Sequence, residues 1–337
     1  MTALSILELV RITQDTDARQ AIDNARDLAA HAESWGYQRI WVSEHHNMAG
    51  IASAATSIVL GHVAAGSKTI RVGAGGIMLP NHSPLVIAEQ FGTLARLYPG
   101  RIDLGLGRAS GSDQQTVRAL RQQLGVDTFP QDVLELQSYF SKDAAKRPVQ
   151  AVPAAGTEVP LWILGSSTYG AQLAAEFGLP YAFASHFAPE FLVPALNIYR
   201  SRFRPSAQLA RPRAMVGVNI VAAETDAEAR RLATTQQMSF TDMIRGGKDL
   251  SRPPIKDIET YWSPRERAHV LGMLARSIVG NPETVRRGIA ALIAETGADE
   301  LTIVCDIYDH KLRLRSYEIV ASVAPVNLNT SDERELA

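Results

Sequence analysis

Composition and charge narrow the function of this chain before any motif is considered. It has 337 residues, 46% of them hydrophobic, and its 34 basic and 35 acidic side chains nearly cancel. A near-neutral chain gives no electrostatic reason to expect nucleic acid or an anionic membrane surface as a partner. The single cysteine, Cys305, excludes an internal disulfide, and no apolar run is long enough to span a bilayer. We therefore expect a cytoplasmic protein with no nucleic-acid or membrane partner.

Short apolar runs alternate with amphipathic helical patterns along nearly the whole chain. The helical patterns include one from Ala18 to Ala32, two that begin at Pro84 and Pro282, and a last one at Leu312–Val323. The runs that predict strands are Leu4–Leu9, Arg39–Glu44, Ile70–Leu79, Arg101–Leu106, Leu161–Leu164, Tyr181–Ala184, Ala214–Val221 and Leu301–Cys305. Eight strands in strict alternation with helices favour an α/β fold of the (β/α)8 TIM-barrel type, in a single domain, over an open doubly wound sheet.

Two stretches interrupt this alternation. Residues 141–160 are rich in Pro, Ala and Lys and predict a surface loop. Residues 246–262 lack apolar periodicity, and a long insertion beyond the seventh strand is either an active-site lid or an exposed loop. We predict one barrel over residues 1–325, with insertions, followed by a polar tail at 326–337.

The second predicted strand ends in Glu44-His45-His46, which places two imidazoles at one rim of the barrel. Side chains alternate faces along a strand, so His45 and His46 should point in opposite directions and chelate one metal poorly. The first strand also lacks a His-x-His motif, and we predict no metal site. One of the two histidines, facing the barrel axis, could act as a general acid or base. The alternative is a histidine with a structural role, hydrogen-bonded to a loop carbonyl.

Glycines and an arginine follow at the ends of the next two strands. In Gly73-Ala74-Gly75-Gly76, three glycines in four positions indicate either a bulge or a place where a flat ligand approaches the backbone. Arg108, just beyond the fourth strand, suits an anionic ring or a phosphate, or is an ordinary solvated arginine.

The fifth strand ends in Gly165-Ser166-Ser167, directly before a helix. Hydroxyls and free backbone N–H groups at a helix N-terminus form the outline of a phosphate cradle, although a serine N-cap needs only one of them. His186 follows the sixth strand on the same rim, as a substrate contact or as a loop histidine. The rim lacks the paired carboxylates of a retaining glycosidase. A phosphate-bearing cofactor that carries its own reactivity fits these residues best.

From Leu4 to about Val323 the chain resembles the bacterial luciferase-like flavin monooxygenases. The resemblance rests on the order and spacing of several motifs: Trp41-Val42-Ser43-Glu44-His45-His46, Val72 to Pro80, Ser83-Pro84, Tyr98-Pro99-Gly100-Arg101, Gly105-Leu106-Gly107-Arg108, Gly165-Ser166-Ser167 and Gly178-Leu179-Pro180. It implies a (β/α)8 barrel that binds reduced FMN from a separate reductase. Oxygen would then form a flavin C4a-hydroperoxide that oxidises a small organic substrate.

The resemblance also implies a role for each site residue. His45, with His46 beside it, would match the catalytic histidine. Ala74, Gly75 and Gly76 would lie beneath the flavin ring, with the Gly75–Gly76 peptide bond in the cis form. The flavin phosphate or ring would be held by Arg108, and the phosphate by Gly165 and Ser166 with the neighbouring Ser167. His186 is a candidate substrate contact from its place on the rim, not from the resemblance.

Three points stay open in the sequence. Luciferase has an acidic residue where Gly165 stands and a reactive cysteine where Gly107 stands, so we expect an oxygenase of the family rather than a luciferase. A deazaflavin (F420) oxidoreductase of the same fold and a flavin-binding protein without turnover are the alternatives. The family also implies a homodimer through the second and third helices, but the apolar set Ala52, Ala55, Ile58, Val59 and Val63 fits the barrel-facing side of a helix better.

Overall fold

The computed structural model describes residues 2–108, 114–120 and 127–324 and shows a closed parallel barrel. Consecutive strands pair in parallel, the sixth strand pairs with the seventh, and the last strand pairs with the seventh and back to the first. The strands of the ring are β1 (Ala3–Glu8), β2 (Arg39–Val42), β3 (Arg71–Met78), β4 (Ile102–Gly107), β5 (Leu161–Gly165), β6 (Tyr181–Phe183), β7 (Ala214–Ala222) and β9 (Glu300–Val304). This confirms the predicted (β/α)8 barrel. The predicted tail at 326–337 lies outside the described residues.

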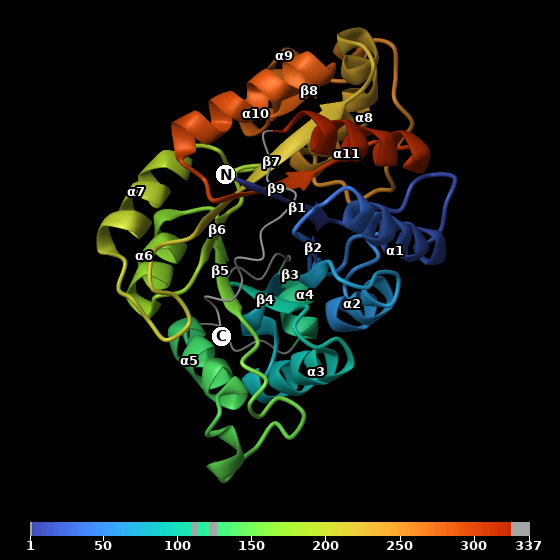
Figure 1. Cartoon of the computed structure of the whole chain (residues 1–337). Helices are drawn as coiled ribbons and strands as arrows, with labels where there is room; N and C mark the ends of the chain where they lie inside the picture. Colours follow the sequence, from blue (N-terminus) through green and yellow to red (C-terminus); the bar gives the residue numbers. More distant parts are fainter. Residues whose placement is uncertain (1, 109–113, 121–126, 325–337) are drawn as a thin grey trace.

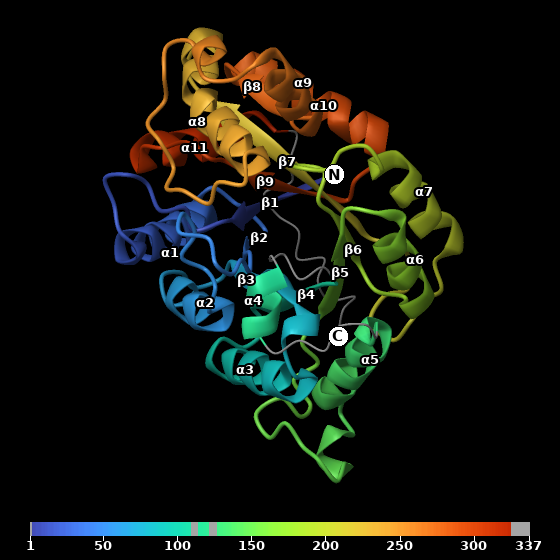
Figure 2. The same ribbon diagram turned by 180° about the vertical axis from the view of Figure 1, so that it is seen from behind.

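Helices surround the ring of strands, as Figures 1 and 2 show from opposite sides. They are α1 (Ala18–Ser34), α2 (Thr56–Ala64), α3 (Pro84–Leu97), α4 (Gln114–Ala119), α5 (Phe129–Phe140), α6 (Thr168–Phe177), α7 (Leu192–Arg202), α8 (Asp226–Ile244), α9 (Pro264–Met273), α10 (Pro282–Thr296) and α11 (His310–Val323), with short 3₁₀ turns η1 (Leu79–Asn81), η2 (Ala144–Lys146) and η3 (Ile258–Thr260). None of the helices in the described part of the chain is long and apolar enough to cross a membrane.

Local sequence signals explain where several helices begin and end. Asp17 caps α1 by accepting a hydrogen bond from the backbone N–H of Gln20, and Asn281 caps α10 in the same way. Proline is the first residue of α3, α9 and α10. A backbone N–H at this position would have no acceptor within the helix, so proline loses no hydrogen bond there. Gly297 ends α10 with φ +56°, the left-handed conformation that glycine adopts without steric penalty.

The structure adds three elements of detail to the sequence expectations. A ninth strand, β8 (Ile278–Gly280), pairs with the end of β7 outside the ring and is too short to leave a periodic pattern. Residues 141–160 are more than a surface loop, because Ala151 and Ala154 are fully buried and pack into the core. On α2, Val59 and Val63 are buried, whereas Ile58 is 75% exposed, so the apolar set of that helix is divided between the core and the surface.

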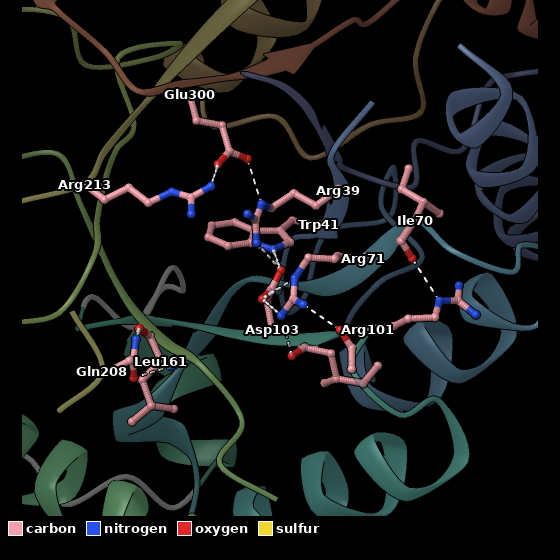
Figure 3. A network of polar contacts seen from close by, with 12 residues as sticks. Arg39, Trp41, Ile70, Arg71, Arg101, Asp103, Leu161, Gln208, Arg213 and Glu300 are labelled. Carbon is pink, nitrogen blue, oxygen red and sulfur yellow. Dashed lines mark hydrogen bonds and ion pairs between the residues drawn. The ribbon is translucent and has the colours of Figure 1, made fainter. Parts of the chain in front are cut away.

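A buried ionic network fills the barrel below the mouth (Figure 3). Arg39 lies between two carboxylates: it pairs with Asp103, and its Nε lies 2.7 Å from Glu300 Oε1. Arg71 and Arg213 supply the other cations, to Asp103 and Glu300 respectively. Burial opposes ionisation of Asp103, but the two arginines outweigh it and lower the pKa of its carboxyl to about 2. These residues therefore form a continuous chain of ion pairs beneath the cavity described next.

Candidate active site

A cavity of about 900 Å³ opens at the carboxyl ends of the barrel strands, the end at which TIM barrels carry their active sites. Its floor is a small apolar cluster inside the ring that includes Leu7, Trp41 and Val304. The volume lies toward the upper end of the range for ligand pockets, which leaves room for a cofactor together with a substrate. The predicted site residues that line it are His45, His46, Gly75, Gly76, Arg108, Gly165, Ser166, Ser167 and His186.

The wall formed by β3, β4 and β5 consists largely of bare backbone. Gly75 and Gly76 line the cavity, the peptide bond between them is cis as the resemblance implies, and the β3–β4 register shifts there. An added Cβ on Gly165 would meet nothing closer than 3.6 Å, so it would make only ordinary van der Waals contacts with Gly170 and Tyr181. Ala74 departs from the prediction: its side chain is fully buried in the core between barrel and helices and does not line the cavity. Alternation of faces along β3 is the reason.

Arg108 and the first residues of α6 meet at one corner of the cavity. The Arg108 guanidinium lies over the ring of Tyr169, 4.2 Å from its centroid, and Tyr169 is the second residue of α6. Ser167 occupies the N-cap position of α6 but makes no side-chain capping bond. Arg108 Nε also lies 3.2 Å from Asp127 Oδ2, in a pair whose side chains are both nearly half exposed. The corner thus combines a cation, helix N–H groups and a serine hydroxyl not used for capping.

His45 lies on the other side of the mouth, beyond the end of β2. Its Nδ1 is 3.1 Å from Ser43 Oγ, which orients the ring. Burial, assisted by the charge of Arg11, lowers the pKa of His45 to about 4. The imidazole is therefore neutral at pH 7, the form in which one ring nitrogen donates and the other accepts a hydrogen bond.

His46 turns instead toward a cluster centred on the buried carboxylate of Glu44. His46 Nε2 and His82 Nε2 lie 2.8 and 2.9 Å from Glu44 Oε1, and the backbone N–H of Met78 donates to Oε2. Burial opposes ionisation of Glu44, but hydrogen bonds from His82, His46 and Asn81 outweigh it and lower the pKa of its carboxyl. Glu44, His46 and His82 are also close enough together to hold a metal ion, but the hydrogen bonds already account for the arrangement. The cluster joins the end of β2 to the end of the glycine strand.

Sequence reasoning missed a polar group on the β7–β9–β1 side of the cavity. Arg11, Asn219 and Asp306 all line it, and Arg11 Nη2 lies 3.4 Å from Asp306 Oδ2. His186 reaches the same region because β7 carries a glycine there: an added Cβ on Gly217 would lie 2.6 Å from His186 Nδ1. Burial, with a smaller contribution from His45, lowers the pKa of His186 to about 4. Arg11, His186 and Asp306 lie just beyond strand ends, where no periodic pattern marks them, and Asn219 is a buried polar residue inside the apolar strand β7.

The segment 246–252, part of the predicted lid or loop, forms a wall of the cavity. It is held by backbone hydrogen bonds from Gly50 N–H to the Lys248 carbonyl and from Ser251 N–H to the Ile12 carbonyl, at 3.1 and 2.9 Å. Gly50 allows this close approach, because an added Cβ would collide with the Asp249 carbonyl. Trp41, Phe187 and Phe240 add aromatic side chains to the lining of the cavity, whereas Trp262 packs with Val270 and Leu274 and does not line it.

The low pKa values of His45 and His186 predict that the folded protein loses stability at acidic pH. His45 and His186 have pKa values near 4 in the folded protein, below the ordinary value of 6.5, so the unfolded chain binds more protons between these limits. We expect stability to be unaffected above about pH 6.5 and to fall as the pH is lowered toward 4. Urea unfolding as a function of pH measures this. Replacing both residues by glutamine should flatten the profile in that window, and His269→Gln, on the exposed side of α9, should not.

Comparison with known proteins places this chain in a family. The model of the luciferase-like monooxygenases matches residues 2–300. This chain belongs to the luciferase-like monooxygenase family. It is 51% identical over 323 residues to the luciferase-like monooxygenase of Escherichia coli (strain K12), covering 95% of this chain and 96% of that protein. It is 50% identical over 324 residues to the uncharacterized protein YvbT of Bacillus subtilis (strain 168), covering 96% of each.

Solved structures agree with this assignment. The crystal structure of apo-MsnO8 has a TM-score of 0.85 at 33% identity and covers 96% of this chain and 98% of that one. More distant structures share the fold, at TM-scores of 0.69 and 0.68 and identities of 18% and 15%. They are the oxygenating constituent of 3,6-diketocamphane monooxygenase of Pseudomonas putida in complex with FMN, and an F420-dependent secondary alcohol dehydrogenase. The fold therefore occurs with both flavin and deazaflavin cofactors, and family membership confirms the predicted resemblance.

Proposed function

We propose that this member of the family is a monooxygenase that uses reduced FMN, supplied by a separate flavin reductase, and activates O2 as a flavin C4a-hydroperoxide to oxidise a small organic substrate. The observation that carries the proposal is the division of the cavity. One side is bare glycine backbone that leads to Arg108 and the start of α6, and the other side holds a neutral imidazole. A planar ring joined to a phosphate-bearing chain fits the glycine side.

The glycine side meets the steric and electrostatic requirements of FMN. Gly75, Gly76 and Gly165 present no side chain to a ring placed against the wall. Arg108, Ser166 and Ser167 would hold the phosphate, using the guanidinium, the hydroxyls and the N-terminal end of α6. Asp127 does not prevent this, since an exposed ion pair is weak and a phosphate dianion competes well for the arginine.

The other residues of the cavity would control protons and water. Reduced FMN, when bound, supplies the electrons for oxygen activation. His45, neutral at pH 7, would accept or return a proton at the reacting group, with Ser43 fixing its orientation. His46, held by Glu44, would keep the wall rigid beside the cis peptide. The apolar floor around Trp41 and the 246–252 wall would exclude water from the reacting group.

Arg108→Ala tests the phosphate assignment. Because a charge-assisted contact contributes about 1.5–3 kcal/mol, we expect the variant to bind FMN roughly 10- to 100-fold more weakly. Riboflavin, which lacks the phosphate, should bind the variant and the unmodified protein equally. Titration of both flavins by fluorescence quenching measures the difference. Arg19→Ala, on the exposed surface of α1, is the matched control and should leave both affinities unchanged. Equal loss for FMN and riboflavin would contradict the assignment.

A deazaflavin oxidoreductase is the second candidate, since a barrel of this fold works with F420. The FMN-dependent and the F420-dependent enzyme would differ in their use of oxygen, because a deazaflavin transfers hydride without forming the hydroperoxide. Titration with F420 beside FMN separates them.

We also propose a homodimer through α2 and α3. The exposure of Ile58 on α2 supports it, and sedimentation of Ile58→Asp tests it.

A further inference from the structure

The loop after β6 brings His186 to the cavity wall, and a buried polar network fixes the backbone of this loop against β7. Ser185 Oγ donates to the Gly217 carbonyl, and Asn219 Nδ2 donates to the His186 carbonyl. Gln236 Nε2 on α8 donates in turn to Asn219 Oδ1 at 2.8 Å. Ser185, Asn219 and Gln236 are all buried, where satisfied hydrogen bonds hold a single geometry. The position of His186 relative to β7 is therefore fixed.

The imidazole of His186 takes no part in this network. Its ring nitrogens form no hydrogen bond with any residue that the structure describes. Nδ1 is buried against β7, where a Cβ added to Gly217 would lie 2.6 Å from it. Nε2 is the ring nitrogen that keeps accessible surface, and it faces the cavity that His186 lines. Anchoring the loop uses only backbone atoms of His186 and does not explain an imidazole at this position.

The surroundings of Nδ1 decide which nitrogen carries the proton. Burial lowers the pKa of His186 to about 4, so at pH 7 the ring is neutral and only one nitrogen is protonated. A proton on Nδ1 would point at the Cα–H of Gly217, where the described residues provide no acceptor. A lone pair at Nδ1 makes a weak but tolerated contact with that C–H. The proton therefore lies on Nε2, and His186 presents an N–H donor to the cavity.

His186 lies close to the imidazole to which the proton transfer is assigned above. A positive charge on His45 would lower the pKa of His186, so the two rings are neighbours at the cavity wall. We propose that His186 is a substrate-binding residue whose Nε2–H donates a hydrogen bond to an acceptor atom of the substrate, beside the group on which His45 acts. This inference rests on the function proposed above, in which FMN occupies the glycine side of the cavity and leaves the side of His186 to the substrate.

The donor and the cavity floor together define the substrate class. The floor around Leu7, Trp41 and Val304 is apolar. The substrate is thus an apolar molecule with a hydrogen-bond acceptor near its reacting atom, held at the acceptor by His186 and packed on the floor by its apolar part.

The tautomer of His186 is measured by long-range ¹H–¹⁵N NMR of the histidine-labelled protein, without flavin. We expect a neutral ring at pH 7 with its proton on Nε2, and the signal that disappears in His186→Gln assigns it. A ring protonated on Nδ1, or on both nitrogens, would overturn the proposal whether or not the protein uses FMN.

Two probes of matched shape test the binding role: heptan-2-one and 2-methylhept-1-ene, which differ in having C=O or C=CH₂. Calorimetry gives the ratio of their affinities for the protein loaded with oxidised FMN and for the flavin-free protein. We expect the preference for the ketone to fall roughly 3- to 10-fold in His186→Leu, the value of one neutral hydrogen bond. His186→Gln, which keeps an N–H donor, should retain most of the preference. An unchanged ratio in His186→Leu would overturn the proposal.

Gly217→Ala provides an independent variant, because its methyl group would displace the imidazole while leaving His186 in the sequence. It should lower the ketone preference as His186→Leu does. Gly272→Ala on α9 is the matched control, since its added Cβ would meet no atom within 4 Å, and it should keep the ratio of the unmodified protein. If His186→Leu does not fold, Gly217→Ala and the tautomer decide. If FMN fails to bind, the function proposed above fails, while the tautomer and the flavin-free ratio still decide the role of His186.

Discussion

His45→Ala is expected to lower the rate of substrate oxygenation by roughly 10²- to 10⁴-fold, the range over which a positioned general acid or base contributes. The physical reason is that the cavity buries a neutral imidazole, oriented by Ser43, on the side facing the proposed flavin wall. Binding of reduced FMN should change little, because the glycine wall and the Arg108 corner are untouched. The measurement is product formed per NADH oxidised, with a flavin reductase supplying FMNH2.

The loss should also change the fate of oxygen. Without His45 we expect the oxygen consumed to appear mainly as hydrogen peroxide rather than in product. His269→Ala, on the exposed side of α9, is the matched control and should keep the coupling of the unmodified protein. Full coupling in His45→Ala would contradict the role assigned to this residue and would favour a histidine that only completes the wall.

Asp103→Asn is expected to reduce the free energy of unfolding by about 3–5 kcal/mol, as the loss of one partner of a buried ion pair does. Asp103 is fully buried and faces both Arg39 and Arg71, with Trp41 Nε1 3.3 Å from its Oδ2. The amide keeps the shape but leaves two arginines with less negative charge. Gly73 allows β3 to approach Asp103 this closely, since an added Cβ would lie 2.6 Å from the Asp103 carbonyl oxygen.

The midpoint of urea unfolding measures the effect of Asp103→Asn on stability. Asp143→Asn is the matched control: its carboxylate pairs with Lys146 on the surface, where both side chains are about 80% exposed. Such pairs contribute little, so the control should unfold at the midpoint of the unmodified protein. Coincident curves for the two variants would contradict the account of a chain of ion pairs that supports the cavity floor.

The fold was largely predictable from the sequence, because buried parallel strands leave continuous apolar runs. All eight strands of the ring were found in this way. The ninth, Ile278–Gly280, was not, since three residues carry no periodicity. The helix starts at Pro84 and Pro282 were predictable because proline and the residue before it fix local geometry.

The site was predictable only in part. Glycine runs, an arginine and histidines at strand ends mark the rim by residue type, and nearly all of those predicted line the cavity. Ala74 was included on the basis of the glycine motif, although the alternation of faces directs its side chain into the core. Arg11, His82 and Asp306 escaped prediction because their importance comes from neighbours far away in sequence: the partner of Arg11 is 295 residues distant. Contacts of that kind depend on closure of the ring.

The most direct test of the central claim is an anaerobic titration of the protein with reduced FMN, followed by rapid mixing with oxygenated buffer while the flavin spectrum is recorded. We predict saturable binding and a reoxidation that passes through a long-lived C4a-oxygenated flavin spectrum, slower than that of free FMNH2. Absence of binding, or reoxidation at the rate of free FMNH2 with no such intermediate, would contradict the monooxygenase assignment. Binding of F420 in place of FMN would then identify the hydride-transferring alternative.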